Sequence, residues 1–275
     1  MDRETIAAAY RAACHEELRA LKPGNVHDFA AGHRMAVSDF ETSAVLSAGP
    51  LTEPGARVGA RVLAAVEATR AAVGQNTNLG ILLLCAPLAA AAEAGGDLRG
   101  TLTRVLAGLD RADAVDAFAA IRLAAPGGLG TAERHDVVRE PQATLLAAMA
   151  EAADRDRIAC AYVTGFEDLF STGLPALERA RARGLDPAWR PTAVHLAFLA
   201  GFPDSHVARR HGPARAEALR LEAARIAGEI DLAARPVEPL LAFDTRLKAE
   251  GINPGTSADF TVATLFCARL LAHAA

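Results

Sequence analysis

The most apolar part of the chain begins with the stretch Gly74-Gln75-Asn76-Thr77-Asn78-Leu79-Gly80, which runs directly into Ile81-Leu82-Leu83-Leu84-Cys85-Ala86-Pro87-Leu88. Amides and a hydroxyl group directly before an apolar run are typical of the N-terminus of a buried helix, which Thr77 or Asn78 can cap. Such an end presents backbone N–H groups and the positive end of the helix dipole to an anion. The simplest interpretation is a helix cap, and the rest of the chain decides whether the stretch also binds a ligand.

Composition and hydrophobic period indicate a helical protein. The chain has 275 residues, of which 51% are hydrophobic and only 5% aromatic, and alanine, leucine and arginine dominate it. This length can bury a large core, and the composition is typical of helices that pack closely through alanine. Long helices are expected at 54–73, 158–170, 214–234 and 237–249, and no run alternates as a strand would. We therefore predict an all-α fold in one domain over residues 1–275, with a buried helix after Gly80 at its centre.

Charge and cysteine content exclude several classes of function. A net charge of −4 and a pI near 6.1 provide no basic surface for nucleic acid. The four cysteines are far apart, which favours buried free thiols in a reducing cytoplasm over disulfides or a structural zinc. The acidic start of the chain does not resemble a signal peptide, and the apolar run after Leu79 is too short, and interrupted by Pro87, to span a bilayer. We expect a cytoplasmic protein that binds no membrane and no nucleic acid, and homo-oligomer formation stays open.

Lysine and asparagine are scarce in this chain. Among 29 basic residues only two are lysines, and there are only four asparagines, so the six positions are Lys22, Lys248, Asn25, Asn76, Asn78 and Asn253. All six lie in three short stretches, each beside a glycine turn at a predicted helix boundary. Asparagine prefers caps and turns in any protein, but that preference does not explain why both lysines share these stretches. Lysine suits phosphate oxygens, and asparagine supplies a neutral donor and acceptor. We interpret the six residues as parts of one ligand site.

Carboxylates stand in the polar loops, although recognisable catalytic motifs are absent. The chain has no phosphate-binding P-loop, no dinucleotide-binding glycine pattern, no zinc-protease motif and no nucleophile elbow. Carboxylates beside cations and helix N-termini can hold Mg²⁺ against a polyphosphate. The candidate metal ligands are Asp28, Glu133, Asp136, Asp204 and Asp259. Arg209 and Arg210 would form a second wall of such a cleft, although each of these charges could equally be a solvated surface residue.

Five stretches occur in an order that resembles the family of triphosphoribosyl-dephospho-CoA synthases. They are Lys22-Pro23-Gly24-Asn25-Val26, Asn76-Thr77-Asn78, 125–130 with 133–136, Asp204-Ser205-His206, and the most specific one, Asn253-Pro254-Gly255-Thr256-Ser257-Ala258-Asp259. The resemblance covers nearly the whole chain. It implies an all-α enzyme that uses ATP to alkylate dephospho-CoA at the ribose, releasing adenine, and so makes a prosthetic-group precursor for citrate lyase or malonate decarboxylase. It also implies that Lys22, Asp28, Asp204 and Asp259 face a Mg²⁺-bound polyphosphate.

The chain departs from the usual pattern of that family at one place. The family usually reads Asn-Thr-His-Lys-Gly where this chain has Asn78 and Leu79 in the third and fourth positions, so a cation expected near the phosphates or the leaving base is missing. This version resembles a divergent branch found with one-carbon cofactor genes in methanogens and methylotrophs. It is similar to an enzyme that condenses an aminomethylfuran-methyl diphosphate with the phenol of tyramine or glutamyltyramine, giving the methanofuran or methylofuran core. We favour this condensation, with triphosphoribosyl transfer as the alternative.

Both reactions generate a cation-like carbon beside a polyphosphate and let a hydroxyl group attack it. We expect Mg²⁺, with Lys22 or Lys248, to neutralise the polyphosphate, and the leucine-rich wall after Gly80 to exclude water. His27, His206 or Asp204 would take the proton of the acceptor. The substrates are small molecules, a diphosphate or triphosphate donor and a hydroxyl acceptor. The predicted substrate-binding residues are Lys22, Asn25, Asn76, Thr77, Asn78, Arg209, Arg210, Lys248, Asn253 and Ser257.

Two further classes stay open at this point. An all-α Mg²⁺ hydrolase acting on a ribosyl bond would release adenine or ribose without any acceptor. A helical scaffold without catalytic activity would leave the scarce polar residues dispersed. Clustering of Lys22, Asn76, Asp204 and Asp259 in one cleft would argue against the scaffold.

Overall fold

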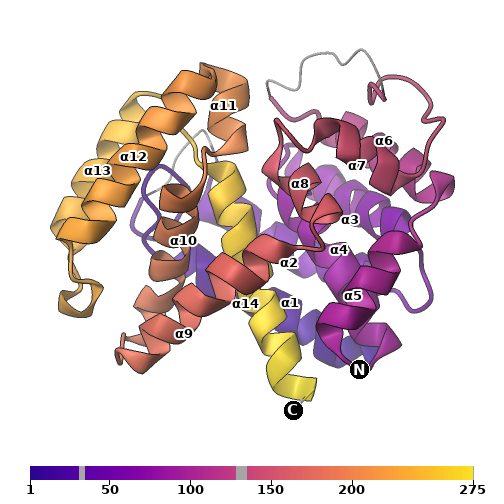
Figure 1. Ribbon diagram of the computed structural model, residues 1–275, viewed down its shortest axis with the longest axis horizontal. Helices are drawn as coiled ribbons and strands as arrows, with labels where there is room; N and C mark the ends of the chain where they lie inside the picture. Colours follow the sequence, from indigo (N-terminus) through magenta and orange to yellow (C-terminus); the bar gives the residue numbers. More distant parts are fainter. Residues whose placement is uncertain (31–34, 128–134, 275) are drawn as a thin grey trace. The chain divides into compact units, whose positions relative to one another are not determined.

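The computed structural model describes residues 1–30, 35–127 and 135–274, and the regular elements in these ranges are helical (Figure 1). No β-strand occurs in the described residues, so the predicted all-α fold class is confirmed. None of the described helices is by itself long and apolar enough to cross a membrane. Helices α4 (Leu79–Ala94) and α5 (Leu98–Ala107) pass that test only together, and the chain bends by 114° between them.

Its internal contacts divide the chain into two compact units. Unit 1 comprises Met1–Ala13, Asp39–Glu167 and Phe266–Ala275, and unit 2 comprises Cys14–Ser38 and Asp168–Leu265. Besides α4 and α5, unit 1 contains α2 (Val37–Leu51), α3 (Val58–Val73), α6 (Arg111–Ala124), α7 (Leu145–Ala152) and α8 (Arg157–Val163). Unit 2 contains α9 (Leu174–Ala182), α10 (Arg190–Gly201), α11 (Ser205–His211), α12 (Pro213–Glu229) and α13 (Val237–Ala249). The unit boundaries fall within α1 (Arg3–Arg19) and α14 (Gly255–Ala274), and the first two residues of α2 belong to unit 2. The single domain predicted over residues 1–275 stays a prediction.

The apolar run after Gly80 forms α4, and nearly all of its side chains are buried within unit 1. Pro87 lies inside this helix and has no N–H, so the carbonyl oxygen of Leu83 loses its usual helical donor. The hydroxyl group of Tyr162 donates to that oxygen instead, at 2.7 Å. Burial raises the pKa of Tyr162, which keeps this donor protonated. A proline is therefore tolerated in the buried helix because α8 supplies the missing hydrogen bond.

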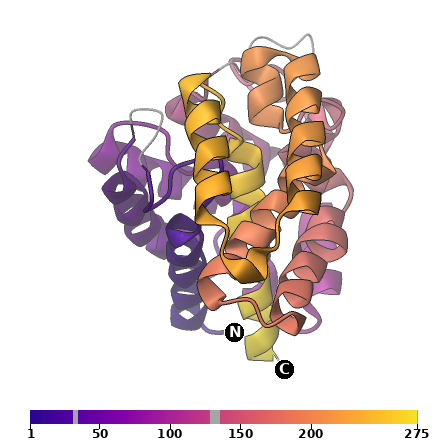
Figure 2. The same ribbon diagram turned by 90° about the vertical axis from the view of Figure 1, so that its left-hand side faces the viewer.

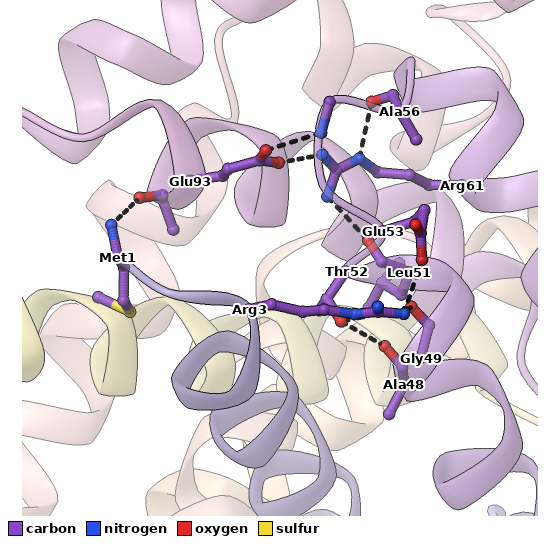
Figure 3. Close-up of polar contacts among 12 residues, drawn as sticks. Met1, Arg3, Ala48, Gly49, Leu51, Thr52, Glu53, Ala56, Arg61 and Glu93 are labelled. Carbon is purple, nitrogen blue, oxygen red and sulfur yellow. Dashed lines mark hydrogen bonds and ion pairs between the residues drawn. The ribbon is translucent and has the colours of Figure 1, made fainter.

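A buried arginine holds the loop between α2 and α3 (Figure 3). Arg61 is only 2% exposed and pairs with the carboxylate of Glu93. It donates to the carbonyl oxygen of Ala56 in this loop at 2.9 Å and to that of Leu51, the last residue of α2, at 3.1 Å. Glu93 also accepts a hydrogen bond from the backbone N–H of Gly55 at 2.8 Å. These contacts hold the loop as a turn, and α3 consequently begins at Val58, not at Pro54 as the sequence predicted.

Two other predicted helices end earlier than expected. The helix expected at 158–170 stops at Val163, because Gly165 and Phe166 have positive φ angles of 65° and 62°, which no α-helix accommodates. The helix expected at 214–234 ends at Glu229, and Asp231 then caps a separate short 3₁₀ turn. The helix predicted at 237–249 is confirmed as α13.

One apolar cluster joins the helices of unit 2. Figure 2 shows α12 (orange) and α13 (golden yellow) joined by a turn at one end, and Leu219 of α12, Leu247 of α13 and Leu199 of α10 are buried in the same cluster. Burying one leucine side chain contributes about 1.5–3 kcal/mol. Ile252 belongs to this cluster too, so the core that joins the helices also fixes the segment that leads into α14.

At Gly173, neighbouring side chains of unit 2 pack directly against the backbone. It ends a π-helical turn (Leu169–Gly173), and a Cβ atom at this position would lie 2.8 Å from Cζ of Phe198 and would also overlap Thr264. Real Cβ atoms do not come so close to ring carbons, so the chain needs glycine here for packing.

We predict that Gly173→Ala lowers the free energy of unfolding by about 1–3 kcal/mol, because the added methyl group must displace Phe198 and Thr264. Gly228→Ala is the matched control, since a Cβ there would meet nothing within 4 Å. Gly228 lies in α12, where alanine should raise stability by about 0.5–1 kcal/mol. Urea unfolding of the three proteins measures both changes. A Gly173→Ala protein as stable as the parent would contradict the packing described.

Candidate functional site

The segment after α1 turns back on itself at Lys22-Pro23-Gly24-Asn25. The N–H of Asn25 donates to the carbonyl oxygen of Lys22 at 3.0 Å, and Gly24 has a φ of +82°. A Cβ atom on Gly24 would lie 2.8 Å from Cδ of Pro254, so only glycine allows the turn to pack so closely against that loop. Nδ2 of Asn25 donates to Oδ1 of Asn253 across the contact, at 2.8 Å. Two of the stretches singled out in the sequence therefore meet within unit 2.

Lys22 is buried, with 1% of its surface exposed, beside the similarly buried Glu17 of α1. Its ammonium group pairs with the Glu17 carboxylate and donates to Oδ1 of Asn25 at 3.2 Å. Burial raises the pKa of Glu17 and lowers the pKa of Lys22, while each charge opposes the shift of the other. An anionic ligand would therefore compete with Glu17 for this cation. Glu17 was not among the residues predicted from the sequence.

The carboxylate of Asp244, in α13, contacts three groups of the same region. Its Oδ1 accepts a hydrogen bond from the N–H of Gly24 at 2.8 Å and lies 3.3 Å from Nε2 of His27, and its Oδ2 lies 3.0 Å from Nζ of Lys248. His27 is 0% exposed. Lys248 also donates to the carbonyl oxygen of Ala30, at 3.0 Å. The predicted residues His27 and Lys248 thus share one carboxylate that the sequence did not reveal.

The charged groups around Asp244 shift one another's pKa values. Burial would raise the pKa of Asp244, but its contacts with His27, Lys248 and the Gly24 N–H hold the pKa below its usual value. Burial lowers the pKa of His27, Asp244 opposes that shift, and the nearby charges of Lys248 and Lys22 add to it. His27 is therefore a neutral imidazole near neutral pH, next to an ionised Asp244.

Asp204 joins the start of α11 to the start of α14. Its Oδ1 accepts from the backbone N–H groups of His206 at 2.9 Å and Val207 at 3.1 Å, which caps α11. Its Oδ2 accepts from the N–H of Ser257 at 2.8 Å and from the Ser257 hydroxyl at 2.9 Å. Burial raises the pKa of Asp204. Both carboxylate oxygens are thus occupied in holding two predicted stretches together, an arrangement that fits a positioning role.

His195 of α10 lies beside both turns. Its side chain is 0% exposed and stands next to the backbone of Pro23 and Ser257. Burial lowers the pKa of His195 to about 3, and the neighbouring charges of Lys22 and His27 act in the same direction. The sequence did not single out His195, because a histidine in the apolar run of α10 looks like an ordinary core residue.

The predicted metal ligands lie in different surroundings. In unit 2, Asp28 is exposed, and Asp259 is half-buried in α14, where its charge raises the pKa of Lys22 against the lowering effect of burial. Asp136 belongs to unit 1 and accepts from the N–H of Val138 at 2.9 Å. Glu133 lies outside the described residues. Within the described part of the chain, no group of three or more His, Cys, Asp or Glu side chains could hold a metal ion by itself.

The two arginines predicted to form the second wall of the polyphosphate cleft belong to α11. Arg209 is half-buried and Arg210 exposed, one residue apart near the end of this helix. His206 is half-buried at its beginning, and its backbone N–H also approaches Oγ1 of Thr256, at 3.2 Å.

The stretch that precedes α4 lies in unit 1. Asn78 occupies the N-cap position of this helix, as one of the two predicted residues, but its side chain makes no capping hydrogen bond. Oδ1 of Asn76 accepts from the N–H of Leu79 instead, at 3.1 Å. Thr77 shares a 2.6 Å hydrogen bond with Ser43 instead, so its hydroxyl group is turned away from the helix end.

Asn78 lies in a buried network without charge. It is 5% exposed, Nδ2 donates to the hydroxyl oxygen of Ser47 at 3.4 Å, and Oδ1 accepts from Thr69 at 3.4 Å. Ser47 is in turn hydrogen-bonded to the hydroxyl group of Tyr10 at 2.9 Å. A neutral amide satisfies these partners, whereas a cation in this place would leave a buried charge to be compensated.

Comparisons with known proteins identify relatives of the chain. A family model described as CitG, ATP:dephospho-CoA triphosphoribosyl transferase, matches residues 3–275. A crystal structure of a provisionally assigned triphosphoribosyl-dephospho-CoA synthase from Archaeoglobus fulgidus is similar in fold, with a TM-score of 0.64 and 24% sequence identity over 82% of this chain and 96% of that one. No curated protein matches the chain.

The buried His195 predicts how stability depends on pH. Its pKa is about 3 in the folded protein against 6.5 for an ordinary histidine. Acid therefore protonates the unfolded chain first, and the stability that the neutral ring contributes is complete above pH 6.5 and is lost as the pH falls towards 3. By pH 5 this loss should amount to about 2 kcal/mol.

His195→Gln should therefore lose less stability than the parent protein between pH 7 and pH 5, since glutamine does not titrate. Urea unfolding at the two pH values measures the difference, and His27, present in both proteins, cancels from the comparison. An identical loss in parent and variant would contradict the buried neutral state of His195.

Proposed function

The chain belongs to the CitG family of ATP:dephospho-CoA triphosphoribosyl transferases, and we propose that it catalyses the reaction after which that family is named. Family membership makes it a transferase that acts on a phosphate-bearing small-molecule substrate. In the proposed reaction the bond between C1′ of the ATP ribose and adenine breaks, and a hydroxyl group on the ribose of dephospho-CoA attacks C1′. The hydroxyl proton ends on adenine, which leaves, and the triphosphate stays on the transferred ribose.

The observation that supports this proposal most is the group of polar residues between the turn after α1 and the segment before α14. The group contains two lysines, two amides and one histidine from distant parts of the sequence, namely Lys22, Lys248, Asn25, Asn253 and His27. Ammonium groups and amides on neighbouring segments are suited to the oxygens of a triphosphate. A partly buried setting strengthens such charge contacts, because the local dielectric constant is lower than that of water.

The contacts of these residues suggest which of them bind phosphate and which accepts a proton. Lys22 and Lys248 would bind phosphate oxygens, in competition with Glu17 and Asp244, their partners in the absence of substrate. The ring of His27, neutral beside Asp244, would accept the proton of the attacking hydroxyl group. The transferred carbon becomes cation-like as adenine leaves, and the triphosphate that it carries lies close enough to stabilise that charge.

We propose that Mg²⁺ enters with the triphosphate. No ready-made group of three metal ligands occurs in the described residues, but Mg²⁺ on a polyphosphate needs only one or two carboxylates, because phosphate oxygens and water complete its shell. Asp28 is exposed and Asp259 half-buried in unit 2, so their oxygens suit such an ion. The ion would neutralise charge on the phosphates.

A second candidate reaction is supported by the stretch before α4. Asn78 and the buried Leu79 stand where relatives with the usual pattern carry a histidine and a lysine, and the network around Asn78 is neutral. The absence of a cation there fits the condensation of an aminomethylfuran-methyl diphosphate with a phenol. In that reaction the bond between the furfuryl carbon and the diphosphate breaks, the phenol oxygen attacks the carbon, and the phenol proton is released.

Two assays on the same purified protein decide between the reactions. In the first, ATP, Mg²⁺ and dephospho-CoA are supplied and released adenine is measured. In the second, a furfuryl diphosphate and tyramine are supplied and released diphosphate is measured. We expect adenine release that requires dephospho-CoA. Diphosphate release with no adenine would replace triphosphoribosyl transfer by the furan condensation, and adenine release without dephospho-CoA would indicate a hydrolase.

We predict that Asp259→Asn lowers turnover at least about 100-fold, because a carboxylate beside Lys22 and the proposed Mg²⁺ is lost from the place where charge develops. Circular dichroism should show an unchanged fold. Asp186→Asn is the control, because Asp186 is a carboxylate of unit 2 outside the candidate site. It caps a short 3₁₀ helix, accepting from the N–H of Ala188 at 3.0 Å, and its loss should leave turnover unchanged. A fully active Asp259→Asn protein would remove Asp259 from the site.

A further inference from the structure

Asp244 stands out among the buried acids of unit 2. It is 1% exposed, lies near the middle of α13, and is not part of any stretch that the sequence singled out. Its two oxygens contact a backbone N–H, an imidazole nitrogen and an ammonium group, which belong to Gly24, His27 and Lys248. Three of the groups that form the candidate site are therefore held by one carboxylate.

Burying an ionised carboxylate costs free energy unless several partners compensate it. Holding the turn at Gly24 does not require a charge, because a neutral amide or hydroxyl oxygen accepts one backbone hydrogen bond equally well. The negative charge of Asp244 is needed for its other two partners. It lies close to the ammonium group of Lys248 and to the ring of His27, and its oxygens fix where both side chains lie.

The contact with His27 also decides where the ring carries its proton. Nε2 of His27 lies 3.3 Å from Oδ1 of Asp244, and a carboxylate oxygen accepts but does not donate, so this contact places a ring proton on Nε2. Nδ1 then carries the lone pair. Within the described residues, both ring nitrogens are fully buried and neither makes a hydrogen bond of good geometry. Nε2 has the Asp244 carboxylate beside it, whereas Nδ1 has no such neighbour. A buried acceptor without a partner is costly, and an incoming hydroxyl group would satisfy it.

We propose that Asp244 is the positioning residue of this site, which acts on turnover through His27 by orienting its ring with the lone pair on Nδ1 towards the acceptor hydroxyl. The inference rests on the proposed function for what His27 does to a substrate. The arrangement itself is a property of the protein without substrate, and it is tested separately from activity.

The first experiment reads the tautomer of His27 by ¹⁵N NMR of histidine-labelled protein, with His27→Gln used to assign the signals. We expect one neutral tautomer, protonated on Nε2, in the parent protein, and a mixture of tautomers in Asp244→Ala. A ring protonated on Nδ1 in the parent, or a single Nε2–H tautomer that persists in folded Asp244→Ala, would overturn the proposal. If Asp244→Ala does not fold, the parent spectrum and Asp244→Asn, which keeps one oxygen acceptor, still decide the question.

The second experiment is a double-mutant cycle on turnover with Asp244→Asn, His27→Gln and the double variant. General-base contributions are typically about 100-fold or more, so each single variant should lose about that factor in kcat. The double variant should lose less than about tenfold more, because Asp244 acts through His27. Losses that multiply would overturn the proposal, and so would Asp244→Asn with the kcat of the parent.

The control and the two readouts separate the possible failures. Asp231→Asn removes a capping carboxylate elsewhere in unit 2, and it should change neither kcat nor the His27 signals. A parent protein inactive in both assays would refute the proposed function, while the tautomer of His27 would still decide whether Asp244 positions it. A parent protein that is active but carries the wrong tautomer would refute the role of Asp244 alone.

Discussion

A buried charge needs a partner, and this requirement organises the candidate site in unit 2. Lys22 is almost completely buried and is paired with Glu17. Asp244 is equally buried, and its carboxylate contacts Gly24, His27 and Lys248. Glu17 and Lys248 are near their partners in the sequence. Gly24 and His27, in contrast, lie more than two hundred residues from Asp244, so this carboxylate links distant segments. The cost of burying these charges is offset only when the turn, α13 and the end of α1 take up one arrangement together. In the proposed reaction, substrate phosphates would then replace carboxylates as partners of the lysines.

The sequence was sufficient to predict much of the fold and some residues of the candidate site. Physical reasons explain which features could be predicted and which could not. Helical period and the lack of alternation were sufficient for the all-α class, and α13 was predicted with its observed ends. Asn25 and Asn253 were grouped by composition, and they are hydrogen-bonded to one another. Scarcity was informative here because a chain rich in alanine and arginine retains asparagine and lysine at few positions.

Candidate-site residues that lie inside regular helices were not predicted from the sequence. Glu17, His195 and Asp244 lie within α1, α10 and α13, where an acid or a histidine fits equally an exposed face or the core. Only tertiary contacts show that all three are buried. The capping hydrogen bond of α4 was misassigned for a related reason: Thr77 and Asn78 have suitable side chains, but their neighbours in unit 1 engage them, and Asn76 is left to accept the first N–H. Competition between local and distant hydrogen-bond partners cannot be seen in a linear sequence.

The proposed function requires that a triphosphate binds where the turn after α1 meets the segment before α14. Backbone amide NMR of the protein titrated with ATP and Mg²⁺ tests it most directly, because it locates binding whether or not turnover follows. We expect the largest changes in chemical shift at Lys22 to His27, at Lys248 and at Asn253 to Ser257. Saturable binding of ATP that leaves these residues unchanged and perturbs only other parts of the chain would contradict it.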